Sequence, residues 1–377
     1  MQIPSKIPEN KHVEYTGKAN WLTKNLGRLL ISIIGPIITF LALWQGFVFL
    51  RSNEASKLVT LIVAIVWGVG GIAALYLFLN MFVESLNPTW TRKLQPFVFI
   101  GPALAVVAYY LAIPTIRTMI ASLMNRDGSA FTGLDNYVSV FTDPAMLVTF
   151  RNNLLWIGFG SSLTVIFGLL IATLADRSRY EAVVKSIIFM PMAISLVGAG
   201  VIWKFVYAAK DVSEPQIGLL NAIVVALGGQ PQAWIAQLQP WNNLFLIVIV
   251  IWMQTGYAMV ILSAAIKGVP AEILEAARVD GANELQVFFT IMLPSILGTI
   301  IAVSTTVVIF TLKIFDVVIV MTGGQYGTEV IATQFYNQYF TFRNFGLGST
   351  LAIILLIAVI PVMIYNLREF NKREVFR

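Results

Sequence analysis

The chain has 377 residues, of which 58% are hydrophobic and only 12% are charged. Soluble domains carry about 25% charged residues, so this much apolar sequence indicates a protein whose solvent is lipid. The absence of cysteine excludes disulfides, cysteine-ligated metals and thiol nucleophiles. The single histidine, His12, stands in a polar N-terminal segment, so we predict neither catalytic residues nor a metal site. The net charge of +6 comes from dispersed basic residues and does not indicate a nucleic-acid partner.

Hydropathy divides the chain into eight apolar runs, each near or above the roughly 20 residues that a helix needs to cross the hydrocarbon layer. The predicted fold class is therefore an all-α membrane protein. Lys and Arg concentrate in alternate polar segments, which places both termini in the cytoplasm. The predicted spans are Leu29–Leu50, Leu58–Val83, Phe97–Ile120, Asn152–Ala175, Val184–Tyr207, Asn243–Ile266, Ser295–Val320 and Leu347–Asn366.

The loop between the sixth and seventh spans, Lys267–Pro294, carries clear helix signals. Pro270 suits the first position of a short helix, predicted over Pro270–Asp280, and Gly281 can end it with a positive φ. Asn283 then has the spacing of an N-cap with Gln286 in a capping box. The sequence predicts two short helices that diverge at Gly281.

The first of these helices is too short to be stable alone in water. Its apolar residues include Ile273, Ala276 and Ala277, and they need a surface to bury against. Glu275 and Arg278 place charges at the rim of this apolar face. One interpretation is an ordinary loop that packs on its own protein, and the other is a docking element for a partner.

Seven positions in this loop fit a known motif. The pattern resembles the EAA motif of binding-protein-dependent ABC importer permeases, and it lies between two predicted spans as that family requires. The resemblance implies that the helix is a coupling helix, which docks in a groove of a separate ATPase subunit. The matching residues are Glu275, Ala276, Ala277, Gly281, Ile291, Leu293 and Pro294.

Further matches run from residue 97 to about residue 370. The sequence of these segments is similar to that of the carbohydrate branch of the family, the group of the maltose permease, and most of all to that of alpha-glucoside permeases. A large insertion that the maltose permease carries between its third and fourth spans has no counterpart here, where the link is about 30 residues. The segments that carry the resemblance are Arg151–Trp156, Asp176-Arg177, Phe189–Pro191, Gly218–Asn221, Phe315-Asp316 and Thr322–Gly324.

The resemblance implies a type I ABC importer permease fold. Together with hydropathy, on which the assignment of residues 1–96 rests, it divides the chain into five parts. A segment at Arg92–Pro96 is interpreted as the loop that separates the first two spans from the rest. The predicted parts are a cytoplasmic N-terminal tail (1–28), two accessory transmembrane helices (29–96), the third span with an outer loop (97–151), the permease core (152–366) with its coupling loop (267–294), and a cytoplasmic C-terminal tail (367–377).

Polar and aromatic residues inside the sixth span are candidates for the substrate pathway, because polar groups in hydrocarbon are costly. Trp252 and Tyr257 can stack on the apolar face of a sugar ring while Gln254 bonds to its hydroxyls. These positions are similar to sugar-facing ones in the maltose permease, although the family has glycine where this chain has Gln254. The alternative is that these aromatic residues pack helices together and that the amide makes one interhelical bond.

The seventh span adds Thr306, Lys313 and Asp316. Lys313 and Asp316 have i, i+3 spacing and can form an ion pair on a helix, which would be purely structural. The resemblance implies instead that Lys313 and Thr306 line the sugar path.

The leading hypothesis is a non-catalytic permease subunit of a sugar importer in the plasma (inner) membrane of a bacterium or archaeon. The resemblance implies a heterodimer with a second permease, two ATPase subunits and an extracytoplasmic sugar-binding protein, in contact with membrane lipid. No phosphate-binding loop motif occurs, so we expect no cofactor on this chain, and ATP and Mg on the partner ATPase. The rival hypotheses are an ion-coupled secondary transporter and a polytopic membrane enzyme. Neither a clear midplane acid with inverted repeats nor a cluster of catalytic groups supports them.

Overall fold

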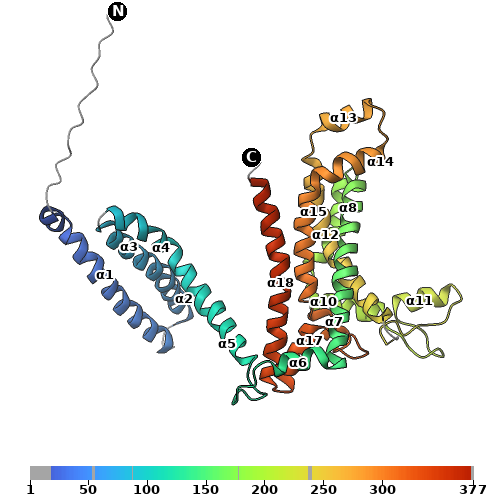
Figure 1. The fold of residues 1–377 in the computed structure, drawn as a ribbon, viewed down its shortest axis with the longest axis horizontal. Helices are drawn as coiled ribbons and strands as arrows, with labels where there is room; N and C mark the ends of the chain where they lie inside the picture. Colours follow the sequence, from blue (N-terminus) through green and yellow to red (C-terminus); the bar gives the residue numbers. More distant parts are fainter. Residues whose placement is uncertain (1–17, 53–55, 87, 177, 237–239, 375–377) are drawn as a thin grey trace, which may run out of the picture. The chain divides into compact units, whose positions relative to one another are not determined.

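The computed structural model describes residues 18–52, 56–86, 88–176, 178–236 and 240–374. His12, most of the predicted N-terminal tail and Arg177 lie outside these ranges. The described chain is nearly all helical (Figure 1). It divides into two compact units, the first ending at Pro114 and the second beginning at Thr115.

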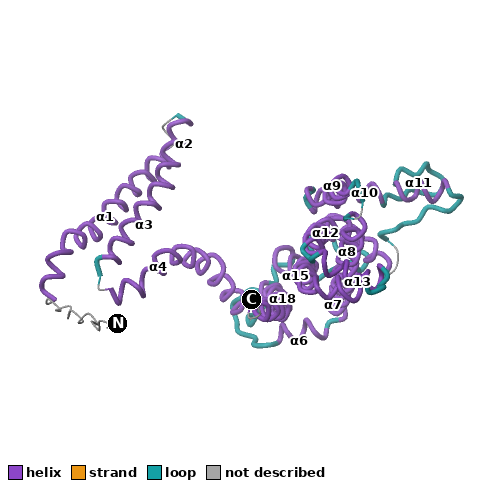
Figure 2. Tube along the Cα trace, turned by 90° about the horizontal axis from the view of Figure 1, so that it is seen from above, coloured by secondary structure: helices purple, strands orange, loops and turns teal. Residues whose placement is uncertain are grey.

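In the first unit, α1 lies beside a second long helical run, which is continuous through α2, η1 and α3 (Figure 2). Gly35 permits the close approach, because a Cβ there would stand 2.3 Å from the Phe78 ring. Most large side chains of this unit are exposed, as expected for helices that face lipid. The segments are α1 (Lys18–Ser52), α2 (Lys57–Ile65), η1 (Val66–Gly70), α3 (Gly71–Glu84), α4 (Pro88–Val107) and η2 (Ala108–Ala112), followed by α5 (Ile113–Ala121), which runs across the boundary of the two units.

The predicted loop at Arg92–Pro96 is wrong, because these residues lie within α4. The chain turns earlier, around Ser85, and Pro88 begins the new helix, where its missing N–H costs nothing. Pro96 is tolerated inside the helix, as prolines in membrane helices often are.

The second unit is built around α12, which lies beside α8 and α15 (Figures 1 and 2). Gly168 of α8 brings the two backbones together, since a Cβ there would lie 2.5 Å from the Cβ of Ala258. The segments are α6 (Asp135–Thr142), α7 (Pro144–Leu155), η3 (Trp156–Ser161), α8 (Ser162–Ala175), α9 (Glu181–Phe189), η4 (Met190–Ala193), α10 (Leu196–Val206), α11 (Leu219–Ala226), α12 (Trp241–Lys267), α13 (Ala271–Val279), α14 (Glu284–Gln286), η5 (Val287–Met292), α15 (Leu293–Leu312), α16 (Asp316–Met321), α17 (Ile331–Tyr336), η6 (Asn337–Thr341) and α18 (Phe345–Glu374).

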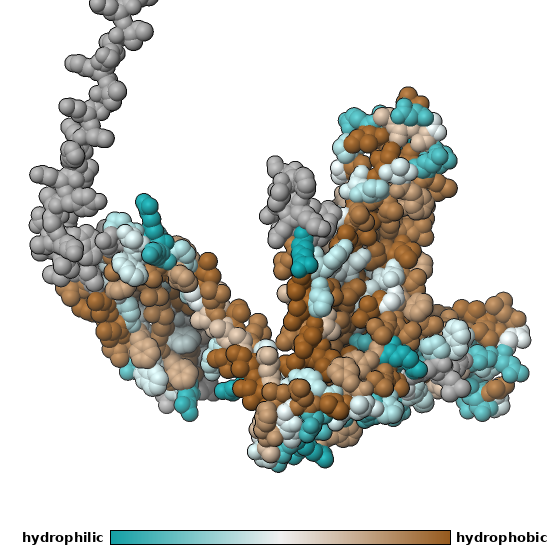
Figure 3. All heavy atoms as spheres, in the orientation of Figure 1, coloured by the Kyte–Doolittle hydropathy of each residue, from teal (hydrophilic) through white to brown (hydrophobic). Residues whose placement is uncertain are grey.

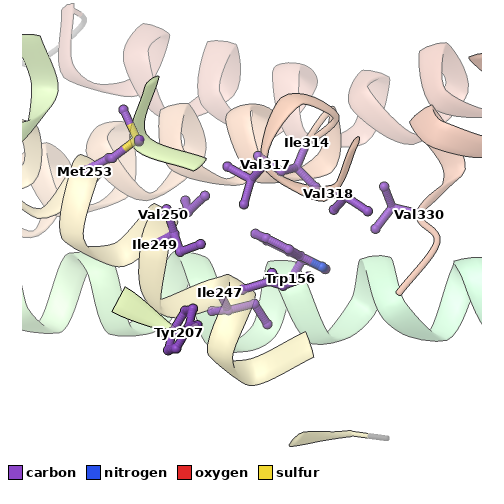
Figure 4. Packing of buried hydrophobic residues seen from close by; sticks show 12 residues of the cluster. Trp156, Tyr207, Ile247, Ile249, Val250, Met253, Ile314, Val317, Val318 and Val330 are labelled. Carbon is purple, nitrogen blue, oxygen red and sulfur yellow. The ribbon is translucent and has the colours of Figure 1, made fainter. Parts of the chain in front are cut away.

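One hydrophobic core lies where α12 meets α10, α16 and η3. Figure 4 shows the fully buried ring of Trp156 among side chains from α12 and α16, including Ile247 and Val318. A second core fills the other half of the α8–α12–α15 bundle and reaches Leu274 of α13. These two cores hold α8, α12 and α15 together.

Seven helical runs of the described residues are long and apolar enough to cross a membrane, and one bent pair makes an eighth if it is counted as one span. The expectation of eight spans therefore holds, but the fifth is not straight. The chain bends by 103° between Glu181–Ala193 and Leu196–Val206. Pro191 lies in the tight η4 turn at this bend, and Ser195 caps α10 by accepting from the Gly198 N–H at 3.0 Å.

The seventh span also differs from its prediction at both ends. Its helix is continuous from Glu284, so the predicted separate helix around Leu285 is the first part of the span. In its first part Leu285 and Phe289 are exposed while Val287, the first residue of the π-helical turn η5, is buried. At the other end the helix stops at Leu312, and α16 begins at Asp316.

Candidate functional site

The break between α15 and α16 is stabilised by an asparagine from a distant part of the chain. Asn153 of α7 donates its amide to the Leu312 carbonyl at 3.1 Å and accepts from the Ile331 N–H at 2.8 Å. Both backbone groups would otherwise be unsatisfied in a buried setting, which is costly in a membrane. Asn153 therefore fixes the place where the seventh span ends.

Two more buried asparagines hold the loop that follows α16. Asn152 donates to the carbonyls of Gly327 and Glu329, at 2.8 and 2.7 Å, and Asn242 donates to that of Tyr326 at 2.6 Å. Tyr326 has a φ of 60°, which is unusual for a residue with a side chain. The side-chain amides replace the hydrogen bonds that an irregular backbone lacks, so this non-helical segment is tolerated beside the spans.

The broken end of α15 opens onto a cavity of about 330 Å³. Three of the predicted substrate-pathway residues, Thr306, Lys313 and Asp316, line it together. The other lining residues are Leu196, Ile309, Phe310, Ile314 and Phe315.

The predicted ion pair between Lys313 and Asp316 does not form, since it is not among the ion pairs found in the described residues. Their i, i+3 spacing assumed a continuous helix, but α15 ends at Leu312 and the backbone turns before Asp316. Lys313 is exposed and Asp316 is partly exposed on the cavity wall. Both charged groups are thus available to a ligand.

The three predicted residues of the sixth span lie elsewhere. Trp252 lines a separate, mainly apolar hollow of about 300 Å³ and stands edge-on to Trp203, with ring centroids 5.8 Å apart. Tyr257 packs against the second hydrophobic core, and Gln254 is partly buried. Neither Gln254 nor Tyr257 lines the cavity at Lys313 or the hollow at Trp252.

The loop at residues 267–294, predicted to be a coupling loop, has the local structure that its sequence predicts. The helix α13 ends in a Schellman motif, in which the N–H of Gly281 bonds to the Arg278 carbonyl at 3.1 Å and that of Ala282 to the Ala277 carbonyl at 3.0 Å. Gly281 has a φ of 89°, a region that residues with a Cβ rarely adopt. The capping box of Asn283 and Gln286 is also present. Pro270 precedes α13 as its N-cap, one position earlier than predicted, because its ψ of 130° is not helical.

The helix α13 presents most of its predicted docking residues to the outside. Ile273, Glu275, Ala276 and Arg278 are exposed, and Ala277 is partly buried. On the inner side, Leu274 packs against the second hydrophobic core and holds the helix to the bundle. In Figure 3 the loop forms a mixed polar and apolar cap above the apolar bundle of the second unit.

Arg278 pairs with Glu284, which follows the turn at Gly281. Its Nε donates to Glu284 Oε1 at 2.7 Å, and this hydrogen bond raises the pKa of the Arg278 guanidinium above its usual range. The pair joins the residues on the two sides of the turn at Gly281. Both partners are exposed, so the pair contributes little to the stability of the loop.

A further group of charged residues was not predicted. Asp176, Glu181 and Lys185 meet Ser263 and Lys267 at the end of the bundle from which the coupling loop leaves. Of these contacts, only that between Glu181 and Lys185 has an i, i+4 spacing that sequence alone could have revealed. The others join helices that are far apart in the chain.

The membrane-length helices of the described residues indicate a multi-pass membrane protein. The family profile described as "Binding-protein-dependent transport system inner membrane component" matches residues 164–375. The chain belongs to this family.

Two curated relatives and one solved structure extend this result. The chain is 54% identical to the osmoprotective compounds uptake permease protein GgtC of Synechocystis sp., over 74% of this chain and 100% of that protein. It is 47% identical to the alpha-glucoside transport system permease protein AglF of Rhizobium meliloti, over 78% of this chain and 87% of that protein. A chain of the bacterial alginate ABC transporter, solved with an alginate pentasaccharide-bound periplasmic protein, has the same fold, with a TM-score of 0.63 and 20% identity over 73% of this chain and 93% of that chain.

Proposed function

We propose that this chain is the permease subunit of an ATP-driven importer that moves a sugar across the plasma (inner) membrane. The observation that carries the proposal is the cavity at the broken end of α15, where Thr306, Lys313 and Asp316 lie together. The similarity to AglF, an alpha-glucoside permease by name, and to GgtC favours an alpha-glucoside or a similar oligosaccharide.

The chemistry of the cavity suits a sugar. The Lys313 ammonium donates hydrogen bonds and the Asp316 carboxylate accepts them, so together they match hydroxyl groups, which do both. Phe310 and Phe315 supply apolar ring surface in the same cavity, suited to the apolar face of a pyranose. Trp252, Gln254 and Tyr257 are proposed to meet the sugar at another stage of its passage.

We propose that α13 docks on an ATPase subunit through Ile273, Glu275, Ala276 and Ala277, with Gly281 setting the angle of the turn. Arg278 lies at the rim of this docking face, where it pairs with Glu284 of the same loop. The chain itself is non-catalytic in this proposal, with ATP and Mg bound by the partner, because its sequence has no phosphate-binding loop motif. The complete importer would contain a second permease, two ATPase subunits and an extracytoplasmic binding protein. Both termini and the coupling loop would face the cytoplasm.

The decisive experiment replaces Lys313 in the reconstituted importer. Hydrogen bonds to a charged group contribute about 1.5–3 kcal/mol, so Lys313→Met should raise the apparent KM for an alpha-glucoside by about 10- to 150-fold. Lys210→Met is the matched control, because Lys210 is exposed and pairs only with Glu214 in a loop outside the cavity.

The measurement is uptake of radiolabelled alpha-glucosides, beta-glucosides and amino acids into proteoliposomes. Uptake of amino acids but of no glucoside would refute the sugar assignment. Unchanged alpha-glucoside kinetics in Lys313→Met would show that the cavity is not the binding site.

A further inference from the structure

A cluster of charges ties together three helices of the second unit. Lys185 of α9 contacts Asp176, the C-cap of α8, at 2.5 Å and Glu181 at 2.6 Å, and it also donates to Ser263 of α12. Ser263 donates to the same Asp176 oxygen at 2.7 Å. Glu181 in turn pairs with Lys267, the last residue of α12.

The cluster is arranged so that its members cannot move independently. The side chains of Asp176 and Lys185 are 11% and 18% exposed, and Ser263 is buried, so these two charges depend on their partners in place of water. Two acids and two lysines give the group no net charge. Displacing α9 from α8 or α12 would leave an unpaired, mostly buried charge, which is strongly unfavourable.

A second contact fixes the other end of α9 to α12. Gly256 of α12 receives the backbone of α9 so closely that a Cβ would lie 2.6 Å from the Ile188 oxygen and 2.7 Å from the Phe189 Cα. With the charge cluster near its beginning and this contact at its end, α9 is attached to α12 at both ends. Since Lys267 ends α12 just before the coupling loop, α9 is connected to that loop through α12.

The next helix belongs to the cavity. After the 103° bend, α10 packs on α16, where Gly200 approaches Val320 so closely that a Cβ would lie 2.7 Å from the Val320 Cγ1. Leu196, the first residue of α10, lines the cavity with Lys313. Figure 2 shows α9 and α10 beside α12. The bend therefore lies between a helix fixed to the coupling end and a helix that forms a cavity wall.

We infer that Lys185 is a positioning residue for transport: it locks α9 to α12, so that movement of the coupling loop is converted at the Met190–Ser195 bend into movement of the cavity wall at Leu196. The inference rests on the proposed function, since it assumes an ATP-driven import step. Lys185 touches neither the sugar cavity nor the coupling helix in this arrangement. It acts by keeping α9, α12 and the end of α8 together.

The first test measures the coupling ratio, sugar imported per ATP hydrolysed, in proteoliposomes. Perturbing an energetic coupling network typically changes coupling by about 2- to 30-fold, so Lys185→Met should lower the ratio within this range while the ATPase remains bound. Lys185→Arg keeps the charge and should restore at least half of the ratio. Lys210→Met should leave it unchanged. A normal ratio in Lys185→Met, with only a lower yield of complex, would overturn the inference.

Lys185→Met leaves Asp176 unpaired, which can prevent folding. The double variant Asp176→Asn with Lys185→Met removes both charges, so it should assemble and still show the lowered ratio. If it assembles and couples normally, the inference fails.

The second test needs no sugar and so separates this inference from the proposed function. The chain has no cysteine, which permits site-specific spin labels. Labels at the exposed Val183 of α9 and Val260 of α12 should keep their distance when ATP binds, whereas labels at Val183 and Val201 of α10 should change theirs. In Lys185→Met the Val183–Val260 distance should become variable. The inference is wrong if, in the chain with Lys185 intact, ATP binding changes the Val183–Val260 distance but not the Val183–Val201 distance. This holds even if sugar uptake is normal.

Discussion

The loop at residues 267–294, which we propose couples to the ATPase, and the cavity at Lys313, which we propose binds the sugar, are stabilised in opposite ways. In the loop, the capping box joins residues three apart and the Arg278–Glu284 pair joins residues six apart. At the cavity, the hydrogen bonds of Asn153 join residues 159 and 178 apart. The turn and the caps of the loop are thus set by neighbouring residues, whereas the cavity exists only when distant helices have packed.

This difference predicts how the two regions fail. A change in the loop should weaken the docking of α13 on the ATPase and leave the helix bundle folded, since α13 has no fully buried residue. A change in the asparagines that support the cavity should alter the fold of the transport path itself. The following variants test that distinction, beginning with the largest expected effect.

Asn153→Leu should lower transport by at least about 30-fold, because it leaves the Leu312 carbonyl and the Ile331 N–H without partners. Each unsatisfied buried group costs about 1–3 kcal/mol. Uptake into proteoliposomes and pull-down of the ATPase are measured together, and the ATPase should still bind because the coupling loop is not affected.

Asn337→Leu is the matched control for this variant. Asn337 makes one long contact with Glu329, at 3.4 Å, and should tolerate the change with little loss of uptake. If Asn153→Leu transports normally, the broken end of α15 does not depend on the distant amide.

Gly281→Val should weaken binding of the ATPase by about 5- to 30-fold, because a Cβ at a left-handed φ costs about 1–2 kcal/mol. Gly281→Asn should bind nearly normally, since asparagine tolerates this conformation best after glycine. The measurement is affinity of each purified complex for the ATPase, with thermal stability as the control. Equal affinities for valine and asparagine variants would mean that the turn does not set the docking geometry.

The same contrast explains what sequence could and could not predict. Gly281, Asn283 and Gln286 signal their structure through neighbouring residues, so the turn and the capping box were predicted correctly. The break at Lys313 has no such local signal, because Asn153, far away in the chain, supplies the hydrogen bonds that stabilise it. A continuous helix, and with it an ion pair to Asp316, was therefore the natural but wrong prediction.

The bent fifth span is an intermediate case. Pro191 was visible in the sequence, and proline is a common cause of helix breaks, but membrane helices often contain proline without bending sharply. Tertiary packing decides whether this span bends, because α9 packs on α12 whereas α10 packs on α16. The hydropathy profile therefore located the span correctly and missed its bend.

Trp252→Leu tests whether the sugar path extends beyond the Lys313 cavity. An aromatic stacking contact contributes about 1 kcal/mol, so loss of the ring should raise the apparent KM for the sugar about 5-fold if the sugar passes Trp252. Trp203→Leu is the control, because it removes the same edge-to-face contact without removing Trp252. If both variants change the KM equally, Trp252 serves helix packing alone.

The smallest effect is expected from Arg278→Gln, although Arg278 forms the most visible ion pair of the coupling loop. Exposed pairs contribute little because water competes for both charges and salt screens them. The Schellman motif and the capping box remain in place without it, so binding of the ATPase should change by less than about 2-fold. The measurement is the affinity for the ATPase at low and at high salt. The contrasting variant is Glu275→Lys. Among the described residues of the loop, Glu275 forms no ion pair, and its carboxylate is proposed to face the ATPase directly. Glu275→Lys should lose binding at low salt by a margin that shrinks as salt is added. A large, salt-independent loss in Arg278→Gln would instead show that the guanidinium itself contacts the ATPase and that the local backbone bonds do not suffice to present the helix.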